Sequence, residues 1–150
     1  VWALRPDLLE DYPLAIALEK LLERWSEENG VPGSTTITGE RYPLPITVEV
    51  TLLRAAQESL ANIHRHAIAS RVAVTLSYME DLVALDVQDD GCGFDPQILS
   101  TRVGHSFGLT AMRERVQDLG GSLLVESEPG NGTVIAISIP RPEDRWTASP

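Results

Sequence analysis

Four polar residues between positions 57 and 67 are spaced so that they would share one side of a helix. They are Glu58, Asn62, Arg65 and His66. At about 100° per residue they fall within one arc, with apolar residues on the opposite side. A carboxylate can accept a proton, an amide oxygen can ligate a hard cation, and basic groups add positive charge one turn further on. This combination suits a Mg²⁺-bound phosphate chain, so we interpret the helix as the floor of a nucleotide site. Taken alone, the stretch also fits an ordinary amphipathic surface helix.

A first glycine segment, Asp89 to Gly93, reads Asp-Asp-Gly-Cys-Gly and directly follows a predicted strand. Its two glycines let the backbone turn sharply and approach a flat ligand without a Cβ in the way. A carboxylate at this point can accept a hydrogen bond from an exocyclic amino group. A plain turn and a Ca²⁺ loop are the alternatives, but the spacing lacks the Asp-x-Asp-x-Asp-Gly run and the distal Glu of an EF-hand.

A second glycine segment, Gly104 to Gly108, reads Gly-His-Ser-Phe-Gly and precedes a predicted helix. The free amide groups and the positive end of the helix dipole would face whatever lies in this loop, and phosphate is the expected guest. The segment is not a Walker A loop, because the Gly-Lys-Ser/Thr ending is missing. It is not a dinucleotide-binding fingerprint either.

The elements that must position these segments can be read from periodicity. Helical spacing predicts helices from Pro13 to Gly30, from Ile46 or Thr47 to about Ala67, and from Gly108 to Gly120. Alternation and turn residues predict an edge strand and two hairpins. Their strands cover residues 35–38, 72–78, 82–87, 123–125 and 133–139. The order of elements predicts an α+β fold, a two-layer sandwich with helices on one face of a mixed, mainly antiparallel sheet.

Composition narrows the possible partners. The chain has 150 residues, 43% of them hydrophobic, which fits one domain with a single core. A formal net charge of -10 argues against nonspecific binding to nucleic acid or anionic membranes, so a phosphate site must be local. The single Cys92 suits a reducing cytosol, and no apolar run approaches the roughly 20 residues that span a bilayer. We therefore expect a soluble, intracellular domain, cut from a longer protein because it begins at Val1 without an initiator Met.

The three polar segments, in this order, resemble the N box and the two glycine boxes of the GHKL ATPases. The resemblance covers roughly residues 4–140 and is closest to the ATP-binding domain of bacterial sensor histidine kinases, in the branch that pairs with NarL-type response regulators. Five further motifs also look like that branch. They are Leu4-Arg5-Pro6, Gln57-Glu58, Gly108-Leu109-x-x-Met112-x-Glu114-Arg115, Leu119-Gly120-Gly121 and Pro129-Gly130-x-Gly132-Thr133. The resemblance implies a Bergerat-type ATPase domain over residues 1–140, and we expect residues 141–150 to form a poorly ordered tail.

The resemblance also implies roles for individual residues. Glu58 would polarise the attacking group, Asn62 would ligate Mg²⁺, and Arg65 and His66 would face the phosphates. Asp89 would bind the adenine amino group in a pocket completed by Gly91, Gly93 and Thr133. Backbone amides of Gly104, Gly108 and Leu109 would hold the phosphates, and residues 94–107 would form a short, mobile ATP lid.

The function that the resemblance implies is transfer of the γ-phosphoryl group of Mg-ATP to a histidine on a separate dimerisation domain, for relay to a response regulator. None of the three histidines here lies in a His-Asp or His-Glu context on a helical hairpin, so the phosphoacceptor is expected elsewhere. An anti-sigma-factor-type serine kinase, a GHKL ATPase without an acceptor and a noncatalytic nucleotide-dependent interaction module are the alternatives. We expect the domain to be cytoplasmic, without nucleic-acid or direct membrane contact, even if its parent sensor is membrane-anchored.

Overall fold

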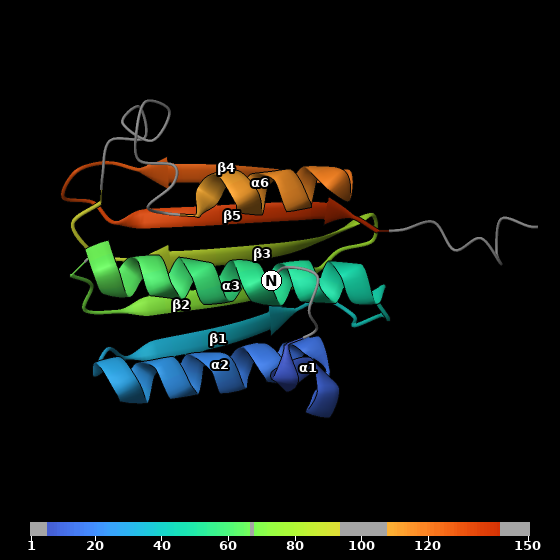
Figure 1. Cartoon of the computed structure of the whole chain (residues 1–150), viewed down its shortest axis with the longest axis horizontal. Coiled ribbons are helices and arrows are strands. Elements are labelled where there is room, and N and C mark those ends of the chain that lie inside the picture. The colour runs from blue at the N-terminus through green and yellow to red at the C-terminus, as the bar shows by residue number, and fades with distance from the viewer. Residues whose placement is uncertain (1–5, 67, 94–107, 142–150) are drawn as a thin grey trace, which may run out of the picture.

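The chain folds into two layers, with helices packed on one side of a single sheet. The computed structural model describes residues 6–66, 68–93 and 108–141, except for the side chains of residues 65 and 66. The helices are α1 (Asp7–Asp11), α2 (Leu14–Asn29), α3 (Ile46–His66) and α6 (Leu109–Asp118). The strands are β1 (Gly33–Thr38), β2 (Val72–Tyr78), β3 (Leu82–Asp89), β4 (Ser122–Ser127) and β5 (Thr133–Pro140). Figure 1 shows the helices in front of the sheet, which confirms the predicted α+β sandwich.

The sheet has five strands in the order β1-β2-β3-β5-β4. β1 runs parallel to β2, whereas β2–β3, β3–β5 and β4–β5 are antiparallel. The prediction of a mixed, mainly antiparallel sheet with β1 at an edge is therefore confirmed. Because β5 lies between β3 and β4, the C-terminal hairpin pairs with the central hairpin after the chain has passed through α6.

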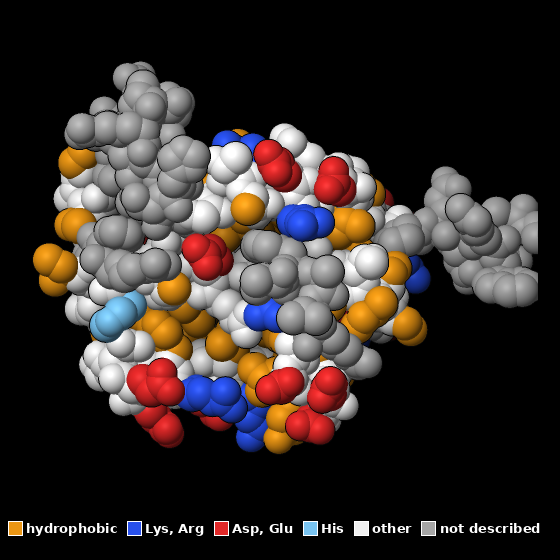
Figure 2. Space-filling view, in the orientation of Figure 1, with side chains coloured by type: hydrophobic (Ala, Val, Ile, Leu, Met, Phe, Trp, Pro, Cys, Tyr) orange, Lys and Arg blue, Asp and Glu red, His pale blue; other side chains and the backbone are white. Residues whose placement is uncertain are grey.

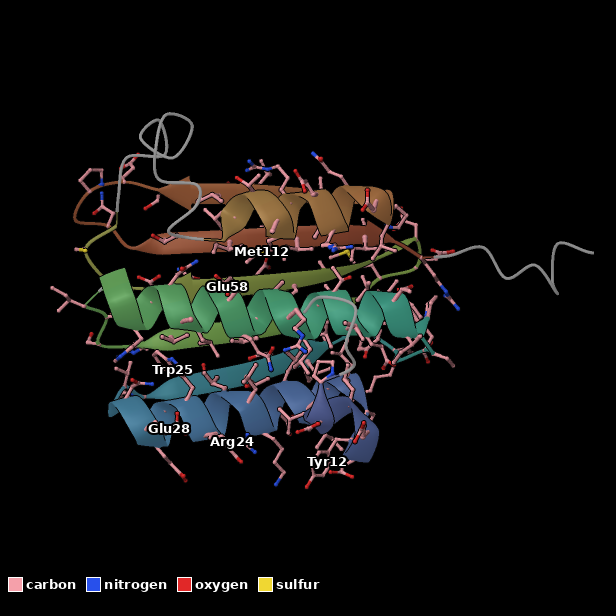
Figure 3. All side chains as sticks on the ribbon, in the orientation of Figure 1. Tyr12, Arg24, Trp25, Glu28, Glu58 and Met112 are labelled. Atoms are coloured by element: carbon pink, nitrogen blue, oxygen red, sulfur yellow. The ribbon has the colours of Figure 1, made fainter. Side chains whose placement is uncertain are left out.

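The core lies between the sheet and the apolar faces of the helices. On α3, the residues predicted to face inward are all buried: Leu53, Ala56, Leu60 and Ile63. The stripe on α2 likewise buries Leu18, Leu22 and Trp25, and Trp25 lies between α2 and α3 in Figure 3. These faces form because apolar residues recur every three or four positions and so line one side of a helix.

Several features differ from the sequence-based expectation. Strand β1 begins two residues before the predicted start at Thr35, and β4 extends one residue before and two residues after the predicted range 123–125. The short helix α1 was not predicted, because five residues are too few for a helical period, and Leu4-Arg5-Pro6 indicated an extended or turning segment. Strand β3 extends to Asp89, two residues past the predicted end at Val87. The apolar alternation stops at Val87, but the ladder continues because Asp89 pairs with strands on both sides.

Glycines end the helices where they were expected to. Gly30 takes a left-handed conformation with φ of 66° after α2, and its amide donates to the carbonyl of Ser26. Gly120 has φ of 79° after α6, and its amide donates to the carbonyl of Gln117. The predicted lid at 94–107 and the predicted tail from residue 142 onward lie outside the described residues, as does the predicted end of α3 at Ala67.

Candidate nucleotide site

The carboxylate of Asp89 is buried at the end of a strand. Asp89 closes β3 with 6% of its surface exposed, and the Gly91 amide donates to its Oδ1 over 2.8 Å. Burial raises the pKa of this carboxyl group above its usual range, with a smaller contribution from the like charge of Asp90. The hydrogen bond from Gly91 opposes both effects. A hydrogen-bond acceptor is therefore held in a low-dielectric position at the edge of the helix-covered face.

Asp89 belongs to a row of residues that crosses four strands. Val72, Asp89, Thr133 and Ser127 are directly opposite one another on β2, β3, β5 and β4. Thr133 is 8% exposed, and its Oγ1 lies 2.8 Å from the hydroxyl oxygen of Ser127. Asp89 and Thr133 thus come together as predicted. Ser127 was not predicted, although the five turn residues between Ser127 and Thr133 could have indicated that these two residues pair.

Two glycines let the β4–β5 turn pack closely against the Asp89–Gly93 segment. Gly93 has φ of 64°, and a Cβ there would overlap the carbonyl oxygen of Glu128. Gly132 has φ of 78°, and a Cβ there would overlap the carbonyl oxygen of Asp89. Both positions therefore require glycine for conformation and for space. The close approaches at Gly93 and Gly132 fix the path of the chain at this end of the sheet, and the role of Gly93 in shaping an adenine pocket stays a prediction.

The second side of the candidate site is formed by α3 and the start of α6. Asn62 is 6% exposed, and Glu58, one helical turn earlier, is half-buried. Glu58 lies on the side of α3 next to α6, as Figure 3 shows. Gly108 precedes α6 with φ of 64°, and a Cβ there would overlap the Glu58 carboxylate. The structure thus brings Glu58 to the N-terminus of α6, where Leu109 is the first helical residue and where the helix dipole favours negative charge.

Three of the predicted phosphate contacts cannot be placed in this way. Arg65 and His66 are the last two residues of α3, but their side chains are not described. Gly104 lies in the segment 94–107, outside the described residues. Their roles stay predictions. His64, one residue before Arg65, is exposed.

Asp90 fastens the segment after α3 to the end of β3. Its carboxylate accepts hydrogen bonds from the amides of Ser70 and Arg71 over 2.8 and 2.9 Å, and from the Ser70 hydroxyl. These bonds, led by those from Ser70, lower the pKa of the Asp90 carboxyl group. Asp90 therefore connects two segments that are 20 residues apart in the sequence.

Asp90→Asn should lower the stability of the domain at neutral pH, because an amide offers one acceptor oxygen in place of two. A carboxyl group whose pKa is lowered by folding stabilises the folded state above its unfolded-state pKa of about 3.9. That contribution is lost as the pH falls through the lower folded-state value. Thermal unfolding from pH 7 to pH 3 should therefore show a difference between wild type and Asp90→Asn that shrinks in acid. Asp11→Asn, at an exposed position on α1, is the control. A difference in unfolding temperature between wild type and Asp90→Asn that does not change with pH would contradict the stabilising role of the Asp90 carboxylate.

Asn62 fits the role of a single protein ligand to a magnesium ion whose other ligands are phosphate oxygens and water. Among the described residues, no group of three or more His, Cys, Asp or Glu side chains is placed to hold a metal ion. Mg²⁺ keeps several waters and commonly takes one or two oxygen ligands from protein, with phosphate oxygens completing its shell. The buried amide of Asn62, on the same face of α3 as Glu58, suits such a role.

Charge on the visible surface is dispersed. Figure 2 shows the Lys and Arg side chains of this face as separate spots among acidic ones, without a continuous basic patch on the part that the structure describes. In that same part of the chain, no helix combines the length and the apolar character needed to cross a bilayer.

The chain is similar to known proteins along most of its length. Residues 47–143 match the family described as histidine kinase-, DNA gyrase B-, and HSP90-like ATPase. DegS of Brevibacillus brevis, a signal transduction histidine-protein kinase/phosphatase, is 35% identical over 93% of this chain and 36% of its own length. UhpB of Salmonella typhimurium, which has the same description, is 37% identical over 92% of this chain and 27% of its own length. The chain thus spans only about a third of these relatives.

The fold is also similar to that of a solved kinase domain. The histidine kinase domain of a blue-light activated kinase from Erythrobacter litoralis superposes with a TM-score of 0.67 at 23% identity. The match covers 86% of this chain and 65% of that one, and it supports the fold. The glycine segments, their order and the sandwich that positions them agree with the family match over residues 47–143. The chain belongs to the histidine kinase-, DNA gyrase B-, and HSP90-like ATPase family.

Proposed function

We propose that this chain binds Mg-ATP and supplies the γ-phosphoryl group to a histidine on a separate dimerisation domain of a sensor kinase. The phosphoryl group then passes to a response regulator, of the NarL type, in the cytoplasm. One observation carries this proposal. Glu58 of α3 lies against Gly108 at the N-terminus of α6, and the buried Asn62 is on α3 as well. The names of the relatives favour a histidine acceptor over the serine kinase, the acceptor-free ATPase and the binding module.

The base is recognised at the strand ends. The Asp89 carboxylate accepts a hydrogen bond from the adenine amino group, and its burial strengthens that bond by excluding water. The hydrogen bond from Gly91 to Oδ1 orients the carboxylate. Thr133 adds a hydroxyl beside it, and the close approaches at Gly93 and Gly132 fix the shape of this end of the sheet.

The triphosphate lies toward α6. Backbone amides of Gly108 and Leu109 face the phosphates at the positive end of the helix, and Gly104, Arg65 and His66 complete these contacts. Asn62 ligates Mg²⁺ through its amide oxygen. When bound, Mg²⁺ neutralises charge that develops on the phosphates during transfer.

Glu58 acts on the attacking group. The acceptor imidazole nitrogen forms a bond to the γ-phosphorus as the bond from that phosphorus to the ADP oxygen breaks. Glu58 accepts the proton that the imidazole loses, because its carboxylate lies beside the helix end that holds the phosphates. Glu58 and Asn62 lie on α3, whereas Asp89 lies at the end of β3, so proton transfer and recognition of adenine depend on different residues.

Asn62→Ala should reduce the gain in ATP affinity that Mg²⁺ provides and leave metal-free adenosine binding nearly unchanged, because the proposed Mg²⁺ ligand is removed and Asn62 has no proposed contact with the base. Titration calorimetry with ATP, with and without Mg²⁺, measures that gain. Gln57→Ala is a control on the same helix, since Gln57 accepts a hydrogen bond from Arg54 and has no assigned role in the site. An identical Mg²⁺ dependence in Asn62→Ala and wild type would assign Asn62 a structural role, and absence of ATP binding by the wild type would refute the proposed function.

A further inference from the structure

Ser127 is a polar side chain next to the base pocket to which no role has been given above. It is the last residue of β4 and is half-buried. Its place in the strand, two and four residues after Val125 and Leu123, puts its side chain on the helix-covered side of the sheet, since side chains alternate along a strand. Its hydroxyl contacts two groups of the neighbouring strand end. The Gly132 carbonyl oxygen lies at 3.1 Å and the Thr133 hydroxyl oxygen at 2.8 Å.

The number of hydroxyl protons fixes the direction of these two hydrogen bonds. A carbonyl oxygen can only accept, so the Ser127 hydroxyl must donate its single proton to Gly132. The Ser127 oxygen then accepts in its contact with Thr133, which makes the Thr133 hydroxyl the donor. With its proton directed at Ser127, the Thr133 oxygen presents only lone pairs on its other sides.

The pocket then presents acceptors to the base. Thr133 pairs directly with Asp89 across β3 and β5, so the two side chains are neighbours on the same face of the sheet. An exocyclic amino group donates two hydrogen bonds and suits both acceptors. An exocyclic carbonyl oxygen at the same ring position meets only lone pairs, and a buried polar group left without a partner costs binding free energy.

We propose that Ser127 is a specificity-determining residue for the nucleobase, because the chain of hydroxyl groups from Thr133 through Ser127 to the Gly132 carbonyl keeps Thr133 an acceptor. This inference rests on the proposed function, which places the base at Asp89 and Thr133. Ser127 itself is a positioning residue and acts through Thr133. Without its hydroxyl, Thr133 can rotate and donate to a carbonyl-bearing base.

The test compares ATP with inosine triphosphate, which has the same sugar and phosphates but a carbonyl oxygen in place of the amino group and a hydrogen on the adjacent ring nitrogen. Titrations at pH 8 give the ratio of the two affinities for each variant. Ser127→Ala should lower the preference for ATP about 5- to 10-fold, the scale of one hydrogen bond. The chain offers a matched control in Ser122→Ala, because Ser122 and Ser138 form a similar hydroxyl pair at 3.1 Å on the same two strands. That variant should keep the wild-type ratio.

A second pair of variants separates the hydroxyl from side-chain packing. The variants are Ser127→Thr and Ser127→Val. Threonine and valine side chains have the same shape and are both common in strands, but only threonine keeps the hydroxyl. Threonine should retain the wild-type ratio and valine should lower it as alanine does. Normal ATP binding with an unchanged ratio in Ser127→Ala and Ser127→Val would overturn this inference alone. Absence of ATP binding by the wild type would overturn the proposed function, and this inference with it.

Discussion

Glu58→Gln should reduce phosphoryl transfer by roughly 10²-fold or more while ATP affinity changes little. The glutamine has nearly the same size and can still lie against Gly108, but it cannot accept the proton of the attacking imidazole. The experiment uses this domain joined to a dimerisation domain that bears the acceptor histidine. The transfer rate and the ATP affinity are measured on the same protein.

Two variants serve as comparisons for Glu58→Gln. Glu49→Gln changes a carboxylate in the first turn of α3, far along the helix from Glu58, and should alter neither quantity. Arg65→Ala should weaken binding of the triphosphate itself, because its expected contribution is charge near the phosphates rather than proton transfer. If transfer and affinity fall together in Glu58→Gln, Glu58 positions the nucleotide or the helix. If neither changes, the kinase interpretation of this helix is wrong.

Asp89→Asn should weaken ATP binding by about 1–3 kcal/mol, which is roughly 5-fold to more than 100-fold in affinity. The asparagine oxygen can still accept the hydrogen bond from the Gly91 amide, which turns its NH₂ group toward the base. Two donors, that group and the adenine amino group, would then face each other in a buried position. Calorimetry that shows equal ATP affinity for both proteins would remove the adenine assignment.

The stability of Asp89→Asn distinguishes a lost contact from a damaged fold. Because burial raises the pKa of Asp89, the ionised carboxylate opposes folding at any pH above its unfolded-state value of about 3.9. The amide carries no such cost. The nucleotide-free variant should therefore unfold at the same temperature as wild type or at a higher one at pH 7, and this advantage should disappear as the pH falls toward 4. A variant that loses both ATP binding and thermal stability at pH 7 would be misfolded.

How much of the site the sequence predicts depends on how local each signal is. Asn62 lies one helical turn after Glu58 on α3, and the helical period alone places both on one face. Gly93 and Gly108 both have positive φ, and the glycine-rich segments in which they lie predict turns. Each of these inferences needs only a few neighbouring residues.

The features that the sequence did not predict depend on contacts between distant segments. Asp90 looks like any turn residue until the structure shows the Ser70 and Arg71 amides against it. Gly108 has φ of 64°, and the Glu58 side chain that lies against it comes from 50 positions earlier in the chain, which no local pattern indicates. Ser127 gains its neighbours from the register of β4 on β5, which no single strand specifies.

The proposed recognition of the base depends on correct pairing of β3, β5 and β4, because Asp89, Thr133 and Ser127 lie in one row across these strands. A slip of one residue in the register of a strand turns its side chains to the opposite face. Even one misaligned strand would therefore move its residue of this row away from the other two. These residues meet only after β5 has paired with β3 across the intervening α6, and such long-range pairings form slowly because the loop-closure entropy comes first. ATP would bind only chains with all of these pairings correct. At 100 times its dissociation constant, it would stabilise that register by about 2.7 kcal/mol over every misaligned alternative.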